Sequence, residues 1–194
     1  MGLRQITVLA VLVLLSACNV AMSDKPLFAE DRRSSRLLLE DGIWTLAKDE
    51  CVANLSKPRT DWPSCVDWVI ISHNKAVLGS DSNPDEGAED VFIVDGKPPL
   101  LQARVTSKGD APFYAYLVFR PAVVSPAGRV STAEVWAVAC GTPEPGNASK
   151  INPYPGFTEH CRTTSIAALR AAANRERPQS NDIATWKWLR AEKP

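Results

Sequence analysis

The chain has 194 residues, of which 45% are hydrophobic and 23% are charged. A chain of this length and composition can bury a core of its own, which speaks against a disordered protein. Its 22 basic residues balance 22 acidic residues, and this balance argues against a nucleic-acid partner, which needs clustered basic residues.

The first seventeen residues have the organisation of an export signal. Arg4 supplies one positive charge, and an almost wholly apolar run then extends from Ile6 to Leu15. This run is too short to cross a hydrocarbon core of about 30 Å as a helix, but it suits the apolar region of a signal peptide. Ser16 and Ala17 follow directly before Cys18. We therefore expect residues 1–17 to be removed.

The four residues Leu15-Ser16-Ala17-Cys18 resemble the lipobox of bacterial lipoproteins at every position. The resemblance implies that the Cys18 thiol carries a diacylglycerol, that the mature protein begins at Cys18, and that acyl chains such as palmitate hold it in a membrane. Asn19 comes next. The sorting habit of enterobacterial lipoproteins then implies a protein of the cell envelope, attached to the outer membrane and facing the periplasm. The alternative is an ordinary secretory signal that leaves Cys18 as a free thiol.

The remaining four cysteines are Cys51, Cys65, Cys140 and Cys161. An even number of cysteines in an exported chain indicates disulfides. Three pairings are possible, and we expect Cys51–Cys65 and Cys140–Cys161 because each closes a loop that contains prolines. A zinc site made of four cysteines is the alternative, but the chain has no Cys-x-x-Cys spacing, so no metal is expected.

Residues 19 to about 38 show no hydrophobic period. We expect residues 18–38 to form a lipidated N-terminus and a flexible tether, and residues 39–194 to form a single β-rich globular domain. From Gly42 on, apolar residues recur with a period of two, which predicts strands. The expected strands cover residues 43–47, 68–72, 75–78, 91–94, 100–105, 113–119, 130–140 and 183–191.

Turns separate these strands at short intervals. His73-Asn74, Asp95-Gly96 and residues 125–128 have the composition of hairpin turns. Ser165 can cap one helix over residues 166–175, which Pro178 would end. Such frequent turns leave no room for crossover helices between parallel strands. The expected fold is mainly β, a β-dominated α+β domain: an antiparallel sheet or barrel of about seven or eight strands, with one C-terminal helix near 165–176 and a short last strand.

Gly42-Ile43-Trp44, at the start of the first expected strand, is similar to the Gly-x-Trp of lipocalins. The resemblance implies that Trp44 plugs one end of an eight-stranded barrel whose open mouth holds a small apolar ligand. The alternative is a core tryptophan at the start of a strand.

Two further groups of residues are candidates for a site. Tyr114, Tyr116, Trp186 and Trp188 are the aromatic residues expected to form a surface for a ligand or partner, and packing within the domain is the alternative. The two histidines, His73 and His160, fall in expected loops, and no catalytic motif surrounds them. No catalytic residue is therefore assigned.

Together these observations predict a cell-envelope protein held in the membrane by its N-terminal lipid. It would bind a small apolar ligand or an envelope protein, use no cofactor and perform no catalysis. Two alternatives stay open, namely a periplasm-facing enzyme with dispersed catalytic residues and an accessory protein for envelope assembly.

Overall fold

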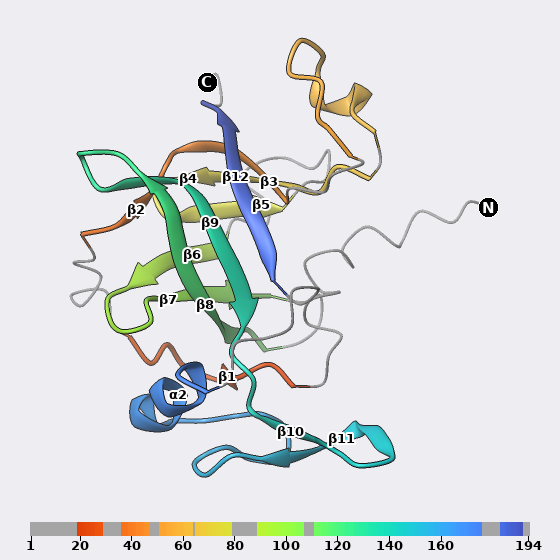
Figure 1. Ribbon diagram of the computed structural model, residues 1–194, viewed down its shortest axis with the longest axis vertical. Helices are drawn as coiled ribbons and strands as arrows, with labels where there is room; N and C mark the ends of the chain where they lie inside the picture. The colour runs from red at the N-terminus through yellow and green to blue at the C-terminus, as the bar shows by residue number, and fades with distance from the viewer. Residues whose placement is uncertain are drawn as a thin grey trace.

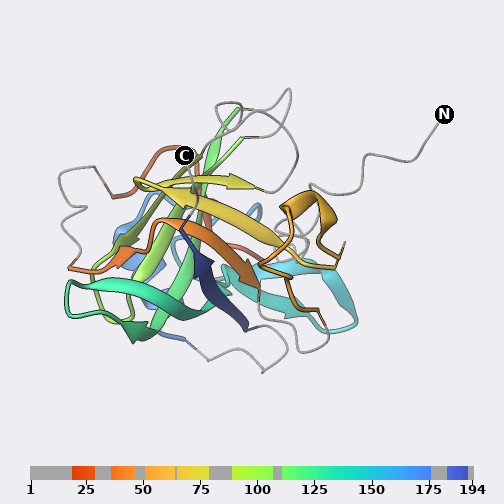
Figure 2. The ribbon, with the colours of Figure 1, turned by 90° about the horizontal axis from the view of Figure 1, so that it is seen from above.

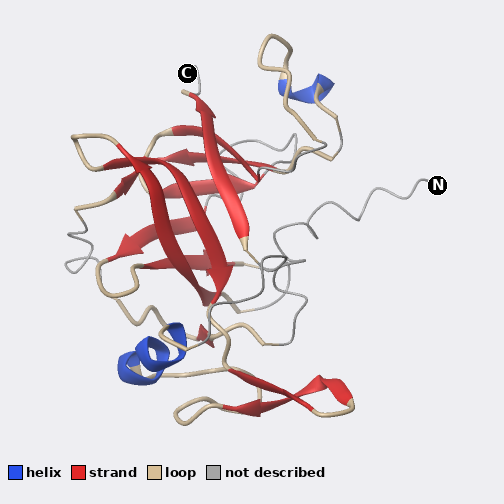
Figure 3. Cartoon of the chain, viewed as in Figure 1, coloured by secondary structure: helices blue, strands red, loops and turns tan. Residues whose placement is uncertain are grey.

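The computed structural model describes residues 19–28, 36–46, 51–63, 65–78, 89–106, 111–175 and 183–191. Strands dominate these segments, as Figure 3 shows. Within the same segments the helices are α2 (Ile166–Ala173) and the short 3-10 helix η2 (Arg59–Asp61). The expected β-dominated fold with one helix before a last strand is confirmed.

Eight antiparallel strands close into a barrel (Figure 1). Neighbours in the chain are neighbours in the sheet, and the ring closes because the last strand pairs with both the first and the seventh. The barrel strands are β3 (Gly42–Leu46), β4 (Trp68–Ser72), β5 (Lys75–Leu78), β6 (Glu89–Val94), β7 (Leu100–Val105), β8 (Phe113–Val124), β9 (Arg129–Ala137) and β12 (Ala184–Arg190).

The period of two in the sequence decides which side chains fill the barrel. In β6, Val91 and Ile93 point inward, whereas Phe92 and Val94 belong to a cluster on the outer wall. Both faces of β6 are buried because other segments of the chain cover that wall. The turn between β4 and β5 has positive φ at His73 (49°) and Asn74 (62°), the conformation that a two-residue hairpin turn requires.

The outer wall near β6, β7 and β8 is covered by α2 and by the N-terminal segment. Ser165 caps α2 as expected, since its Oγ accepts a hydrogen bond from the backbone N–H of Ala168 at 3.1 Å. The helix ends at Ala173. Pro178, which was expected to end it, is five residues further along the chain and lies outside the described residues. Leu169 is fully buried against the barrel and anchors the helix there.

The prediction of a flexible tether over 18–38 is wrong for residues 19–28. This segment, which we call the strap, forms β1 (Met22–Ser23) against β8, and Ala21 in it is completely buried. Its apolar residues cover the outward-facing side chains of the barrel, a role that produces no regular period in the sequence. Further along, β2 (Leu38–Leu39) pairs with β9. Cys18 and residues 29–35 lie outside the described residues.

The strap also shortens the strand that was expected over 130–140. The Val138 N–H still donates to the Tyr116 carbonyl of β8 at 3.0 Å, but the Val138 carbonyl accepts from the backbone N–H of Ala21 at 2.8 Å. Beyond Val138 the strap lies between β8 and the chain that follows β9. A separate hairpin of β10 (Gly141–Glu144) and β11 (Asn147–Pro153) follows. It projects away from the barrel in both Figure 1 and Figure 2.

Both expected cysteine pairs are confirmed. Cys51–Cys65 and Cys140–Cys161 are joined, with Cα–Cα distances of 5.9 and 5.3 Å. The first pair closes a loop whose Trp62 packs on the outward-facing Ile43 of β3. The second pair ties the residue directly before β10 to the loop before α2 and lies beside the strap.

Candidate functional site

The two ends of the barrel differ. At one end, which we call the closed end, hairpin turns join β4 to β5 and β8 to β9, and Leu39 and Val130 are buried within the interior cluster. Trp44 is completely buried, and its Nε1–H donates to the Glu40 carbonyl at 2.8 Å, which directs the ring toward this end. At the other end, which we call the mouth, β3, β7 and β9 finish and β4, β8 and β12 begin.

The mouth contains a hollow with a cavity volume of about 70 Å³. Its walls are almost wholly apolar side chains, and Thr45 and Asp67 are the exceptions. The residues that line it are Trp44, Thr45, Leu46, Asp67, Trp68, Val69, Ala103, Val105, Ala115, Leu117 and Trp186.

Small side chains on paired strands create this hollow. Ala103 of β7 lies directly opposite Ala115 of β8, so two neighbouring positions of the interior contribute only a methyl group each. Protein interiors contain few voids larger than a water molecule, and an eight-stranded barrel is either filled by its side chains or holds one small ligand. The described side chains leave this part of the interior unfilled, and its apolar walls can bury a small apolar group.

The four aromatic residues expected to share a surface do not do so. Trp186 and Trp188 of β12 point into the barrel, and Trp186 lines the hollow. Tyr114 and Tyr116 of β8 point outward into the cluster beneath the strap, where Tyr116 is completely buried. The prediction of one shared surface is wrong because the outward-facing side of β8 is covered and the Trp side of β12 faces the interior.

Neither histidine is among the residues that line the hollow. His73 lies in the β4–β5 turn at the closed end, where its Nδ1 is 3.0 Å from the hydroxyl of the neighbouring Ser72. His160 is exposed beside Glu159 in the loop before α2. Among the described residues, no cluster of three or more histidine, cysteine, aspartate or glutamate side chains is placed to hold a metal ion.

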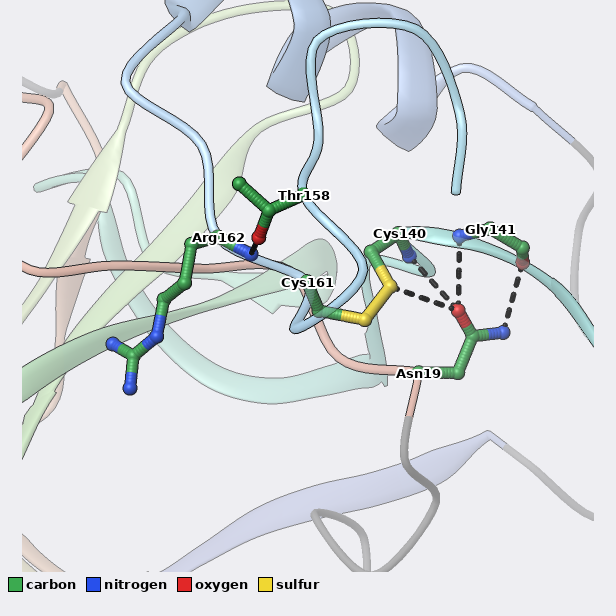
Figure 4. The surroundings of a disulfide bond; sticks show 6 residues. All are labelled: Asn19, Cys140, Gly141, Thr158, Cys161 and Arg162. Carbon is green, nitrogen blue, oxygen red and sulfur yellow. Dashed lines mark hydrogen bonds between the residues drawn. A yellow bond between two sulfur atoms is a disulfide. The ribbon is translucent and has the colours of Figure 1, made fainter. Parts of the chain in front are cut away.

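A second constellation fixes the start of the strap (Figure 4). The side-chain amide of Asn19 donates to the Gly141 carbonyl at 2.9 Å, and its Oδ1 accepts from the backbone N–H groups of Gly141 at 2.9 Å and of Cys140 at 3.1 Å. The Asn19 carbonyl also accepts from the Cys140 N–H at 3.1 Å. We call this set of bonds the Asn19 clamp. It holds the first described residue next to the Cys140–Cys161 disulfide.

Two buried polar side chains hold the rest of the strap. The Tyr116 hydroxyl is 2.7 Å from the Ser23 hydroxyl and accepts from the backbone N–H of Leu27 at 3.1 Å. The Gln102 side chain accepts from the backbone N–H of Phe28 at 3.1 Å. A completely buried amide or phenol is costly without partners, so both residues are suited to a strap that stays in place.

Burial raises the pKa of the Tyr116 hydroxyl, although its hydrogen bonds to Ser23 and Leu27 oppose the shift. Unfolded tyrosines ionise near pH 10, so the folded protein holds this proton more tightly than the unfolded chain does. The stabilisation from neutral Tyr116 is complete below that pH and is lost as the pH rises through the raised pKa. We expect the free energy of unfolding to fall more steeply above about pH 10 in the wild type than in Tyr116→Phe. Urea titrations on both sides of that pH would measure it, and equal slopes would contradict it.

Some residues of the hollow and some residues that hold the strap could not be predicted from the sequence. The sequence indicates Trp186 as a candidate but not Ala103 or Ala115, because the pairing of two alanines is known only when the register of β7 and β8 is known. The sequence gives no signal for Asn19 and Gln102, because each binds backbone more than 70 residues away along the chain.

Among the described residues, no helix combines the length and the apolar character needed to cross a bilayer. Comparison with protein-family models, curated proteins and solved structures finds no match to this chain.

Proposed function

We propose that this chain is a lipid-anchored cell-envelope protein that binds a small apolar ligand in the mouth of its barrel. The apolar hollow beside Ala103 and Ala115 is the observation that carries the ligand-binding proposal. The lipobox ending at Cys18 supports the anchor, and Asn19 after it supports the outer membrane.

The chemistry of the hollow selects the ligand. Its walls offer burial to methyl, methylene and ring groups and expose almost no polar surface. Each methylene group transferred from water to such a surface gains about 0.8 kcal/mol. A largely apolar ligand therefore fits better than a sugar or a charged metabolite.

A series of straight-chain alcohols tests the proposal. We expect the affinity to rise about fourfold for each added methylene group, because each one removes the same apolar area from water. The rise should stop at the chain length that fills the hollow. Titration calorimetry, supported by the fluorescence of Trp44 and Trp186, would measure the affinities.

Matched variants locate the binding. Ala103→Phe places a ring in the hollow and should abolish the dependence on chain length, whereas Ala127→Phe adds the same ring at the exposed turn of the closed end and should leave it unchanged. Thermal unfolding would check that both variants are folded. Equal affinities in the two variants, or no dependence on chain length in the wild type, would rule the binding site out.

A further inference from the structure

The Asn19 clamp fixes the point from which the lipid anchor would leave the domain. Consecutive Cα atoms are about 3.8 Å apart, so Cys18 is one peptide unit from a residue held by four hydrogen bonds. A lipid on Cys18 would therefore be attached to the folded domain directly rather than through a linker.

Strand register places the start of the strap at the mouth of the barrel. Ala137, the last residue of β9, pairs with Leu117, which lines the hollow. Two residues further on, Ala139 bridges to Val20 of the strap. Met22 of the strap pairs with Ala115, another residue that lines the hollow.

The closed end is far from the same point. The turn after β8 is separated from the mouth by the whole of β9, which has nine residues. At about 3.3 Å per residue this strand is about 30 Å long. The two ends of the barrel therefore lie at very different distances from a membrane that holds Cys18.

We propose that the domain sits on the membrane with the mouth end of the barrel toward the bilayer. This inference rests on the anchor in the proposed function. In this orientation the partner of the mouth is a lipid surface, and the ligand is an apolar molecule that enters the hollow from the membrane. The Asn19 clamp would set the orientation because Cys18 alone separates the clamp from the lipid.

Quenching by the membrane measures the orientation. A fluorophore would be attached at Thr106→Cys, an exposed position directly after β7 at the mouth, or at Ala127→Cys at the closed end. The lipidated protein would be reconstituted in phosphatidylcholine vesicles that contain a lipid with a nitroxide on its headgroup. We expect strong quenching of the label at Thr106 and little or none at Ala127. Equal quenching, or stronger quenching at Ala127, would overturn the orientation.

An insertion separates the clamp from the anchor. A flexible Gly-Ser linker of about ten residues between Cys18 and Asn19 spans roughly 17 Å on average, enough to let the domain turn, while the lipid and the clamp both remain. We expect the difference between the two labels to shrink several-fold. If the difference persists, another surface sets the orientation and the role of the clamp is refuted. If the wild-type protein does not stay on the vesicles, the anchor itself fails, and this inference fails with it.

Discussion

Replacing Cys18 with alanine is expected to release the protein from the membrane fraction completely. In the proposed anchor, the thiol would carry two acyl chains and the new amino terminus would carry a third. Each buried methylene group contributes about 0.8 kcal/mol, so several chains hold a protein stably whereas one chain binds only marginally. Fractionation of cells, followed by mass spectrometry of the N-terminal peptide, would show the loss of both the attachment and the lipid.

A cysteine control shows that the effect belongs to the anchor. The double variant Cys140→Ala, Cys161→Ala removes a disulfide beside the strap but leaves Cys18 in place. It should lose stability and remain in the membrane fraction. If the Cys18→Ala protein also stays on the membrane, and its N-terminal peptide differs from that of the wild type only by the substitution, the lipid anchor does not exist.

Trp44→Ala is expected to cost about 3–5 kcal/mol of the free energy of unfolding. The Trp44 side chain is completely buried in the interior of the barrel and closes the inner side of the hollow. Removal of its ring leaves a cavity and takes away the hydrogen bond from its Nε1–H to the Glu40 carbonyl. Urea unfolding monitored by circular dichroism would give the difference directly.

Trp188→Ala is the matched control. Trp188 lies opposite Trp44 on β12 and donates in the same way to the Asp41 carbonyl at 3.0 Å, but it is only partly buried. Its loss should cost clearly less than the loss of Trp44. If the two variants are equally stable, Trp44 is not the residue that closes the barrel interior.

The sequence predicted the elements that repeat a local pattern. The period of two in β6 and β7, the turn at His73-Asn74 and the cap at Ser165 are each set within a few residues, and all are present in the structure. Both cysteine pairs also followed from a local feature, namely the prolines in the loops that they close.

The strap and the hollow depend on contacts between distant residues. The sequence of the strap predicts a linker because its residues contact Tyr116 and Gln102, which are distant in the chain, rather than one another. The hollow depends on the register that sets Ala103 opposite Ala115. The aromatic residues of β8 and β12 were grouped together, but the sequence does not show which side of the barrel each strand turns toward solvent.

Native mass spectrometry of the protein released from membranes tests the proposed ligand most directly. The wild-type protein should carry one apolar molecule in addition to the lipid on Cys18, and the Ala103→Phe protein should carry none. Spectra of the wild type that show no additional molecule, or the same molecule bound to both proteins, would contradict a ligand site in the mouth of the barrel.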